Sequence, residues 1–241
     1  MGGKTFENTI TLSSDEYSKL IKSITLPIKT IYLLPFRLGN KQTYSDIDFI
    51  TPYPQAIIEE IMQIQNIVDT KTINLCKNTQ GFNTDQYSVH LLTNQNLQID
   101  VLKSFNDNSL EITRAYYSYC FANVYFKQYI NLAGRNYSLS HLGLICSSNK
   151  IIFPLNLNYK QINKTTRIVW DCCYIFNLMD LDYESFTKGF ADEFELLKYL
   201  KTSKYYSETI FISNSKFNHD IKRLIPFKNL HNNKMLNYNY K

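Results

Sequence analysis

Three aspartates in two short runs are the residues of this sequence best suited to chemistry. The run Ser45-Asp46-Ile47-Asp48-Phe49 alternates polar and apolar side chains, and Leu97-Gln98-Ile99-Asp100-Val101 places one aspartate between apolar neighbours. Carboxylate oxygens are the ligands that Mg²⁺ prefers, and two-metal sites bridge such carboxylates to substrate phosphates. If the two runs are neighbouring strands, Asp46, Asp48 and Asp100 are predicted to be the ligands of two Mg²⁺ ions and the catalytic residues of a metal-dependent nucleotidyl transfer.

The alternation itself predicts that both runs are β-strands. Successive side chains of a strand point to opposite faces, so Asp46 and Asp48 share one face while Ile47 and Phe49 point into a core. Asp100 is likewise flanked by residues of the opposite face, and a charge between core residues generally has a partner or a metal. The Asp-x-Asp pair taken alone also fits a solvated strand edge.

The elements around these runs predict an α+β fold in which a mixed sheet carries helices on one face. Strands are expected at residues 28–34, 45–50 and 72–76, and a hairpin is expected from 87–92 and 97–102 around a polar turn. Apolar spacing of three and four residues predicts one helix capped by Ser13 or Ser14. A second helix is predicted to begin at Pro54 and to keep Val68 on its apolar face.

The second half of the chain is predicted to be mostly helical with a small sheet. Helices are expected near 121–133, from Thr165 or Thr166 to Met179, and from Phe190 to Tyr199, with a small strand at 151–154. The expected organisation is a domain at 1–108, a second at 109–188, and a basic C-terminal extension at 189–241 that is disordered at its end.

Basic residues dominate the second half of the chain. The formal net charge is +5, there is no Asp or Glu from Ile112 through Trp170, and Asp220 is the only acid after Glu208. An acidic half followed by a basic half is typical of proteins that bind a phosphate backbone, although a solvated basic face has the same composition. The residues predicted to contact nucleic acid are Lys127, Arg135, Lys150, Lys164 and Arg167.

The loop before the first aspartate pair has the composition of a phosphate-binding segment. Gly39 allows close approach of the backbone to a ligand, while Arg37 and Lys41 offer positive charge to phosphate oxygens. Together with Ser45, these residues are predicted to bind a triphosphate.

Other signals argue against a zinc protein and a membrane protein. The five cysteines include no Cys-x-x-Cys pair and the four histidines are scattered, so buried reduced thiols of an intracellular protein are expected. His141, in an apolar run, is expected to be a hydrogen-bonded core residue. No apolar run is long enough to span a membrane, and the first residues lack the layout of a secretory signal. We expect a soluble, monomeric protein of the cytoplasm or nucleus.

Several motifs together resemble those of a known family. Phe36-Arg37-Leu38-Gly39, Ser45-Asp46-Ile47-Asp48 and Ile99-Asp100-Val101 resemble the nucleotidyltransferase superfamily that includes DNA polymerase beta. Further along, the chain looks like the thumb of family X DNA polymerases, in the segments 125–133, 136–145, 150–155, 173–178 and 181–183. The resemblance spans about residues 28 to 186 and is closest to the compact viral members, which have a palm and a thumb only.

The resemblance implies a palm followed by a thumb, and a reaction that adds dNMP from dNTP to a DNA 3′-hydroxyl in repair or gap filling. It implies two Mg²⁺ ions, with Mn²⁺ as a substitute, and a DNA primer-template and a nucleoside triphosphate as partners. Family members carry Gly-Ser where Leu34-Pro35 stand here, and the aromatic-Phe-Thr-Gly element that faces the sugar has no clean copy. Tyr117 and Tyr119 are the candidates to contact the sugar or base.

Two alternatives stay open from the sequence. The same carboxylates suit an enzyme that adds untemplated nucleotides to an RNA tail or a tRNA end. The altered residues Leu34-Pro35 also fit a nucleic-acid-binding module that has lost catalysis.

Overall fold

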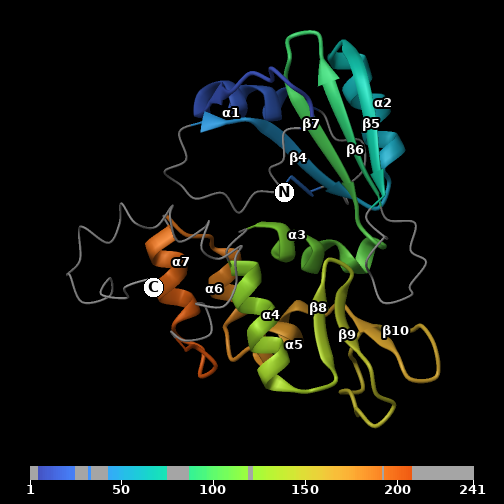
Figure 1. Ribbon diagram of the computed structural model, residues 1–241, viewed down its shortest axis with the longest axis vertical. Coiled ribbons are helices and arrows are strands. Elements are labelled where there is room, and N and C mark those ends of the chain that lie inside the picture. The colour runs from blue at the N-terminus through green and yellow to red at the C-terminus, as the bar shows by residue number, and fades with distance from the viewer. Residues whose placement is uncertain are drawn as a thin grey trace, which may run out of the picture.

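A five-stranded sheet lies at one end of the molecule, and a mostly helical part with a smaller sheet lies at the other (Figure 1). The computed structural model describes residues 5–24, 32–33, 43–74, 87–118, 122–191 and 193–207. The combination of a mixed sheet with several helices confirms the predicted α+β class.

The large sheet brings the two aspartate runs side by side. Its strands, in spatial order, are β2 (Tyr32–Leu33), β4 (Asp46–Thr51), β7 (Gln98–Lys103), β6 (Tyr87–Thr93) and β5 (Ile67–Asn74). Strands β4 and β7 are parallel, whereas the other neighbours in the sheet are antiparallel. The predicted hairpin is confirmed as β6 and β7. Of the strand predicted at 72–76, residues 72–74 form the end of the edge strand β5, and residues 75–76 lie outside the described residues. Most of the strand predicted at 28–34 lies outside the described residues.

Two helices cover one face of this sheet. Helix α1 (Ser14–Ser23) begins at the predicted cap Ser13, whose side chain accepts a hydrogen bond from the backbone N–H of Glu16, while the Glu16 carboxylate accepts one from the Ser13 N–H. This reciprocal capping satisfies two of the free donors at the helix start. A short strand pair, β1 (Leu12–Ser13) with β3 (Thr43–Tyr44), and the stacking of Tyr17 on Tyr44 join α1 to the segment that leads into β4.

Helix α2 (Pro54–Ile64) begins at Pro54, as predicted. Its apolar residues and those of α1 pack with Ile47 and Phe49 of β4 and with the core-facing residues of β6 and β7. The prediction that Val68 continues this helix is wrong. Helix α2 ends at Ile64, and Val68 lies exposed on β5, because Ile67 onward pairs with β6 instead of making another helical turn.

The second part has its own core. Its helices are α3 (Leu110–Ser118), α4 (Ala122–Ala133), α5 (Cys172–Leu178), α6 (Tyr183–Thr187) and α7 (Glu193–Leu200), preceded by a 3₁₀ turn at Asp107–Ser109. Its sheet has the order β10 (Tyr159–Gln161), β11 (Arg167–Val169), β9 (Gly143–Cys146), β8 (Tyr137–Ser140). Leu196, Tyr199 and Leu200 of α7 belong to this core, so the chain through α7 is packed against the second part.

Two predictions for this part are wrong. Residues 151–154 form no strand, and the predicted helix from Thr165 or Thr166 begins only at Cys172. Residues 167–169 are β11, which pairs with β9 and β10, because β-branched Ile168 and Val169 suit a buried strand and these neighbours supply their backbone partners. Asp171 caps α5, its carboxylate accepting from the backbone N–H of Tyr174.

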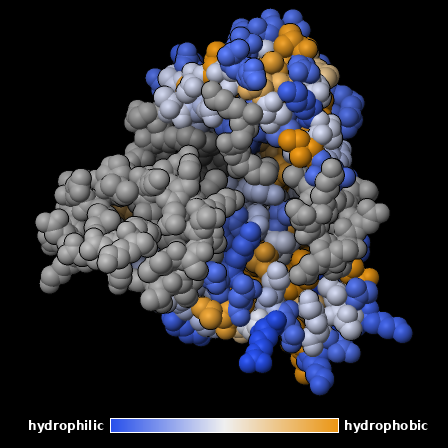
Figure 2. Space-filling model, in the orientation of Figure 1, coloured by the Kyte–Doolittle hydropathy of each residue, from blue (hydrophilic) through white to orange (hydrophobic). Residues whose placement is uncertain are grey.

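A small apolar contact links the two parts. Ile50 of β4 and Leu102 of β7 pack with Leu110 of α3, and Tyr117 of α3 lies against the same cluster. Because Ile50 and Leu102 follow Asp48 and Asp100 by two residues, they lie on the aspartate face of the sheet. The aspartate face is therefore the one turned toward the second part. The visible surface is hollowed between the two parts, and its hydrophobic residues are scattered (Figure 2).

Candidate metal centre

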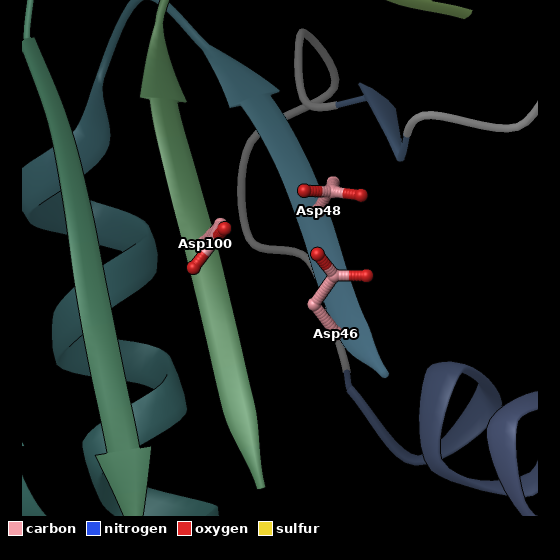
Figure 3. A group of neighbouring side chains, drawn as sticks. All are labelled: Asp46, Asp48 and Asp100. Carbon is pink, nitrogen blue, oxygen red and sulfur yellow. The ribbon is translucent and has the colours of Figure 1, made fainter. Parts of the chain in front are cut away.

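The three aspartates converge on one face of the large sheet. The parallel register of β4 and β7 sets Asp48 directly beside Asp100. Asp46 lies two residues before Asp48 on the same face of β4 (Figure 3). One carboxylate oxygen from each aspartate lies within 4.8 Å of the others. Asp46, Asp48 and Asp100 are buried, with 9%, 7% and 3% of their surface exposed. The condition set by the sequence, that the two runs are neighbouring strands, is therefore met.

This donor set fits a hard divalent cation. Three carboxylates at this separation repel one another when ionised, and a cation between them offsets that repulsion. The candidate ligand atoms are all oxygens, which suits Mg²⁺ or Mn²⁺. Structural zinc, in contrast, is typically bound by nitrogen and sulfur atoms. Both strands lie within the sheet and pack on α2 through their other face, so the side chains start from fixed backbone positions.

The sequence reasoning missed the residues that hold Asp100. His90 of β6 lies opposite Asp100 in the antiparallel pair, and its Nδ1 is 2.7 Å from the Asp100 Oδ1. Gln98 donates from Nε2 to both carboxylate oxygens, at 2.9 and 3.1 Å. The predicted pairing of residues 87–92 with 97–102 would set residue 90 across from residue 99. In the structure Leu92 pairs with Gln98, so the register differs by one residue and His90 lies across from Asp100.

The predicted triphosphate-binding residues are only partly within the described chain. Arg37, Gly39 and Lys41 lie outside the described residues, as do Leu34 and Pro35. Ser45 is exposed at the bend before β4, and its hydroxyl donates to Asp46 Oδ1 at 3.3 Å. Ser45 therefore lies at the edge of the carboxylate cluster.

Tyr117, predicted to contact a sugar or base, lies on α3 beside the aspartate face. It packs against the cluster of Ile50, Leu102 and Leu110, and its ring is edge-on to that of Tyr116. Burial, and to a smaller degree Tyr116, raises the pKa of the Tyr117 phenol above its usual value, so the hydroxyl stays protonated at neutral pH. Tyr119, the other candidate, lies outside the described residues.

His141 is half-buried in the turn between β8 and β9, and the expectation of a hydrogen-bonded core histidine is wrong for its Nε2 atom. That atom is buried with no hydrogen-bond partner, and the ring lies 6.2 Å from each of the Tyr116 and Tyr117 rings. Burial, followed by the nearby Lys127 charge, lowers the pKa of His141 to about 4. The ring is therefore neutral at pH 7 because both its surroundings and its neighbour disfavour a second proton.

The predicted nucleic-acid-binding residues come from separate segments of the second part. Lys127 is exposed on α4 with its Nζ 5.1 Å from the centre of the Tyr116 ring. Arg135, Lys150 and Lys164 are exposed in the turns that follow α4, β9 and β10. Arg167 is half-buried: its guanidinium donates to the Ile151 carbonyl at 2.9 Å and lies over the Phe153 and Tyr159 rings. Arg167 therefore fixes a loop of its own sheet.

The cysteines of the described residues are only partly as expected. Cys146 and Cys172 are buried, and burial raises the pKa of each thiol to about 12, which keeps both protonated. Cys173 is exposed, contrary to the expectation. In the described part of the chain, no helix has the length and apolarity needed to cross a membrane.

Neither the models of known protein families nor the curated proteins include a match to this chain.

Proposed function

We propose that this chain is a metal-dependent nucleotidyltransferase, similar to a small family X DNA polymerase, that adds dNMP from dNTP to a DNA 3′-hydroxyl. The observation that carries the proposal is the convergence of Asp46, Asp48 and Asp100 on one face of a mixed sheet. Two of these ligands are on one strand with a single residue between them, and the third is beside them on a parallel strand. That arrangement agrees with the resemblance of the same residues to the nucleotidyltransferase superfamily.

The three aspartates have different tasks in this proposal. Asp46 and Asp48 would hold both Mg²⁺ ions, and Asp100 would hold the ion nearer to the attacking hydroxyl. When bound, the two ions supply positive charge at the attacking and leaving oxygens of an in-line displacement. The sheet contributes by fixing the carboxylates before substrate arrives, because their strands are packed on α2 from behind.

Residues next to the triad suit the remaining contacts. Ser45 lies at the start of β4, where its hydroxyl is close to Asp46 and suits contact with the triphosphate together with Arg37, Gly39 and Lys41. Tyr117 lies beyond the other end of the aspartate face, against Ile50 and Leu102. The exposed cations of the second part would hold the primer-template through its phosphates, as a thumb does.

A primer-extension assay tests the proposal. Purified protein is incubated with Mg²⁺ and one substrate pair at a time, a primed or gapped DNA with dNTPs or a single-stranded RNA with each NTP. We expect the wild-type protein to extend the DNA primer and the Asp100→Asn protein not to extend it. Extension of the RNA alone would replace DNA polymerisation by RNA tailing, and no extension of either by freshly folded protein would overturn the proposed transfer in favour of a binding module.

We expect Tyr117 to influence which sugar is accepted. Replacing Tyr117 with Ala removes the ring that packs beside the aspartate face, so a ribose 2′-hydroxyl would meet less steric resistance. Incorporation of rNTP relative to dNTP should rise about tenfold, in line with what one apolar contact contributes to selection. The ratio of kcat/KM values for the two nucleotides measures the effect. Tyr159→Ala, at an exposed tyrosine of β10, is the control and should leave the ratio unchanged.

A further inference from the structure

His90 is a buried side chain in direct contact with one of the three candidate metal ligands, Asp100. It is 6% exposed and lies on β6, which is adjacent to β7 and is separated from β4 by β7. Its Nδ1 lies 2.7 Å from Asp100 Oδ1, and its Nε2 lies 2.9 Å from the hydroxyl of Ser88. Both ring nitrogens therefore have a partner, so the ring orientation is determined from two sides.

The contacts continue beyond the ring to a segment from the start of the chain. The Thr5 hydroxyl lies 3.2 Å from the His90 Nδ1, and the Thr5 N–H donates to Gln98 Oε1. The amide of Gln98 in turn donates from Nε2 to Asp100. Lys71 of β5 donates to the Thr5 carbonyl and lies over the Phe6 ring, which holds this segment against the sheet. Two residues that contact Asp100 are thus themselves held in place.

These contacts are unequal for the two oxygens of Asp100. Oδ1 lies at hydrogen-bonding distance from both His90 and Gln98. Among the residues that the structure describes, Oδ2 has only the longer contact, 3.1 Å, to Gln98. An ionised carboxylate accepts hydrogen bonds only, so with Asp100 ionised His90 donates from Nδ1 and its Nε2 can accept from Ser88. Oδ1 of Asp100 is thus anchored by His90 and Gln98, and these two contacts orient the carboxylate.

We propose that His90 is a positioning residue of the metal centre. It fixes the Asp100 carboxylate so that one oxygen is bound within the sheet and the other is presented to a cation shared with Asp46 and Asp48. The inference rests on the metal site of the proposed function. Partners of this kind hold ligands in the geometry that a metal requires, and their loss typically weakens metal binding about 10–100-fold.

Binding of Mn²⁺ alone tests this inference. The dissociation constant is measured by electron paramagnetic resonance of free Mn²⁺, on the full chain without nucleotide or nucleic acid. His90→Leu, which removes the donor and puts an apolar side chain of similar size in its place, should raise the dissociation constant about 10–100-fold. His90→Asn keeps a donor near the Nδ1 position and should recover most of the affinity. Unchanged binding in a folded His90→Leu protein would overturn the inference.

Two further variants separate positioning from general damage to the strand. Val89→Ala removes buried volume from the same strand but from its other face, and it should leave Mn²⁺ affinity unchanged. Equal weakening in Val89→Ala and His90→Leu would overturn the inference. If His90→Leu does not fold, Ser88→Ala carries the test, because it removes only the hydroxyl that orients the ring. We expect a severalfold loss of affinity there, and an unchanged constant overturns the inference.

The assay also distinguishes this inference from the proposed function. A wild-type protein that binds Mn²⁺ in a His90-dependent way but extends no primer would overturn nucleotidyl transfer and support the role of His90. A protein that extends primers but binds Mn²⁺ equally well with and without His90 would overturn the role of His90 alone.

Discussion

Asp48→Asn should lower the proposed nucleotidyl transfer by about 10³-fold or more. The substitution keeps the shape of the side chain but removes the charge of the residue directly beside Asp100. Metal charge stabilises the transition state by several kcal/mol, and each ~1.4 kcal/mol corresponds to a factor of ten in rate. The rate of single-nucleotide addition to a primed DNA at saturating dNTP measures the effect.

The matched control is Asp69→Asn. Asp69 is an exposed aspartate on the edge strand β5 of the same sheet, so the chemical change is the same but the site is untouched. Its rate should remain within a factor of two of the wild-type rate, as a rough bound for surface changes. If the Asp48→Asn protein transferred nucleotides at the wild-type rate, Asp48 would not be part of the proposed catalytic centre.

Phe49→Ala should lower the free energy of unfolding by about 3–5 kcal/mol. Phe49 is fully buried in the core between the large sheet and helices α1 and α2. The space left by its ring would therefore not be open to solvent. The substitution removes apolar contacts and leaves a cavity behind the strand that carries Asp46 and Asp48. Urea denaturation followed by far-ultraviolet circular dichroism measures the change.

Val68→Ala serves as the comparison for that measurement. Val68 lies on β5 of the same sheet and is 58% exposed, so little apolar surface returns to water when it is shortened. The free energy of unfolding should change by no more than about 0.5 kcal/mol. If both variants lost the same stability, Phe49 would not belong to the core of the sheet.

Local patterns were sufficient where neighbouring residues along the chain decide the structure. The period of two at residues 46–49 predicted which side chains are buried behind β4, and the polar turn predicted the β6–β7 hairpin. Ser13 or Ser14 was predicted to cap the first helix, and Ser13 is the cap. Such a cap is visible in the sequence because the hydroxyl and the N–H that it contacts are only three residues apart.

Patterns failed where a distant segment supplies the partner. The spacing of Ile168, Cys172 and Ile175 fits a helix, yet Ile168 lies in β11 because β9 and β10 offer backbone partners on both sides. The spacing of Val68 from Ile61 and Ile64 also fits the apolar face of α2. Val68 nevertheless lies on β5, because this segment pairs with β6. The charge of Arg167 likewise gave no indication of its contacts with the Ile151 carbonyl and with two rings.

The sequence by itself determined that Asp46 and Asp48 share a face and that Asp100 lies on a strand between core residues, since both depend only on backbone periodicity. The tertiary structure alone decided that β4 and β7 are parallel neighbours, which sets Asp48 beside Asp100 and makes three separate carboxylates one cluster. It also decided that Ile50 and Leu102 turn this face toward α3. Pairing of strands so far apart in the chain depends on which faces bury each other, and no short stretch of sequence contains that information.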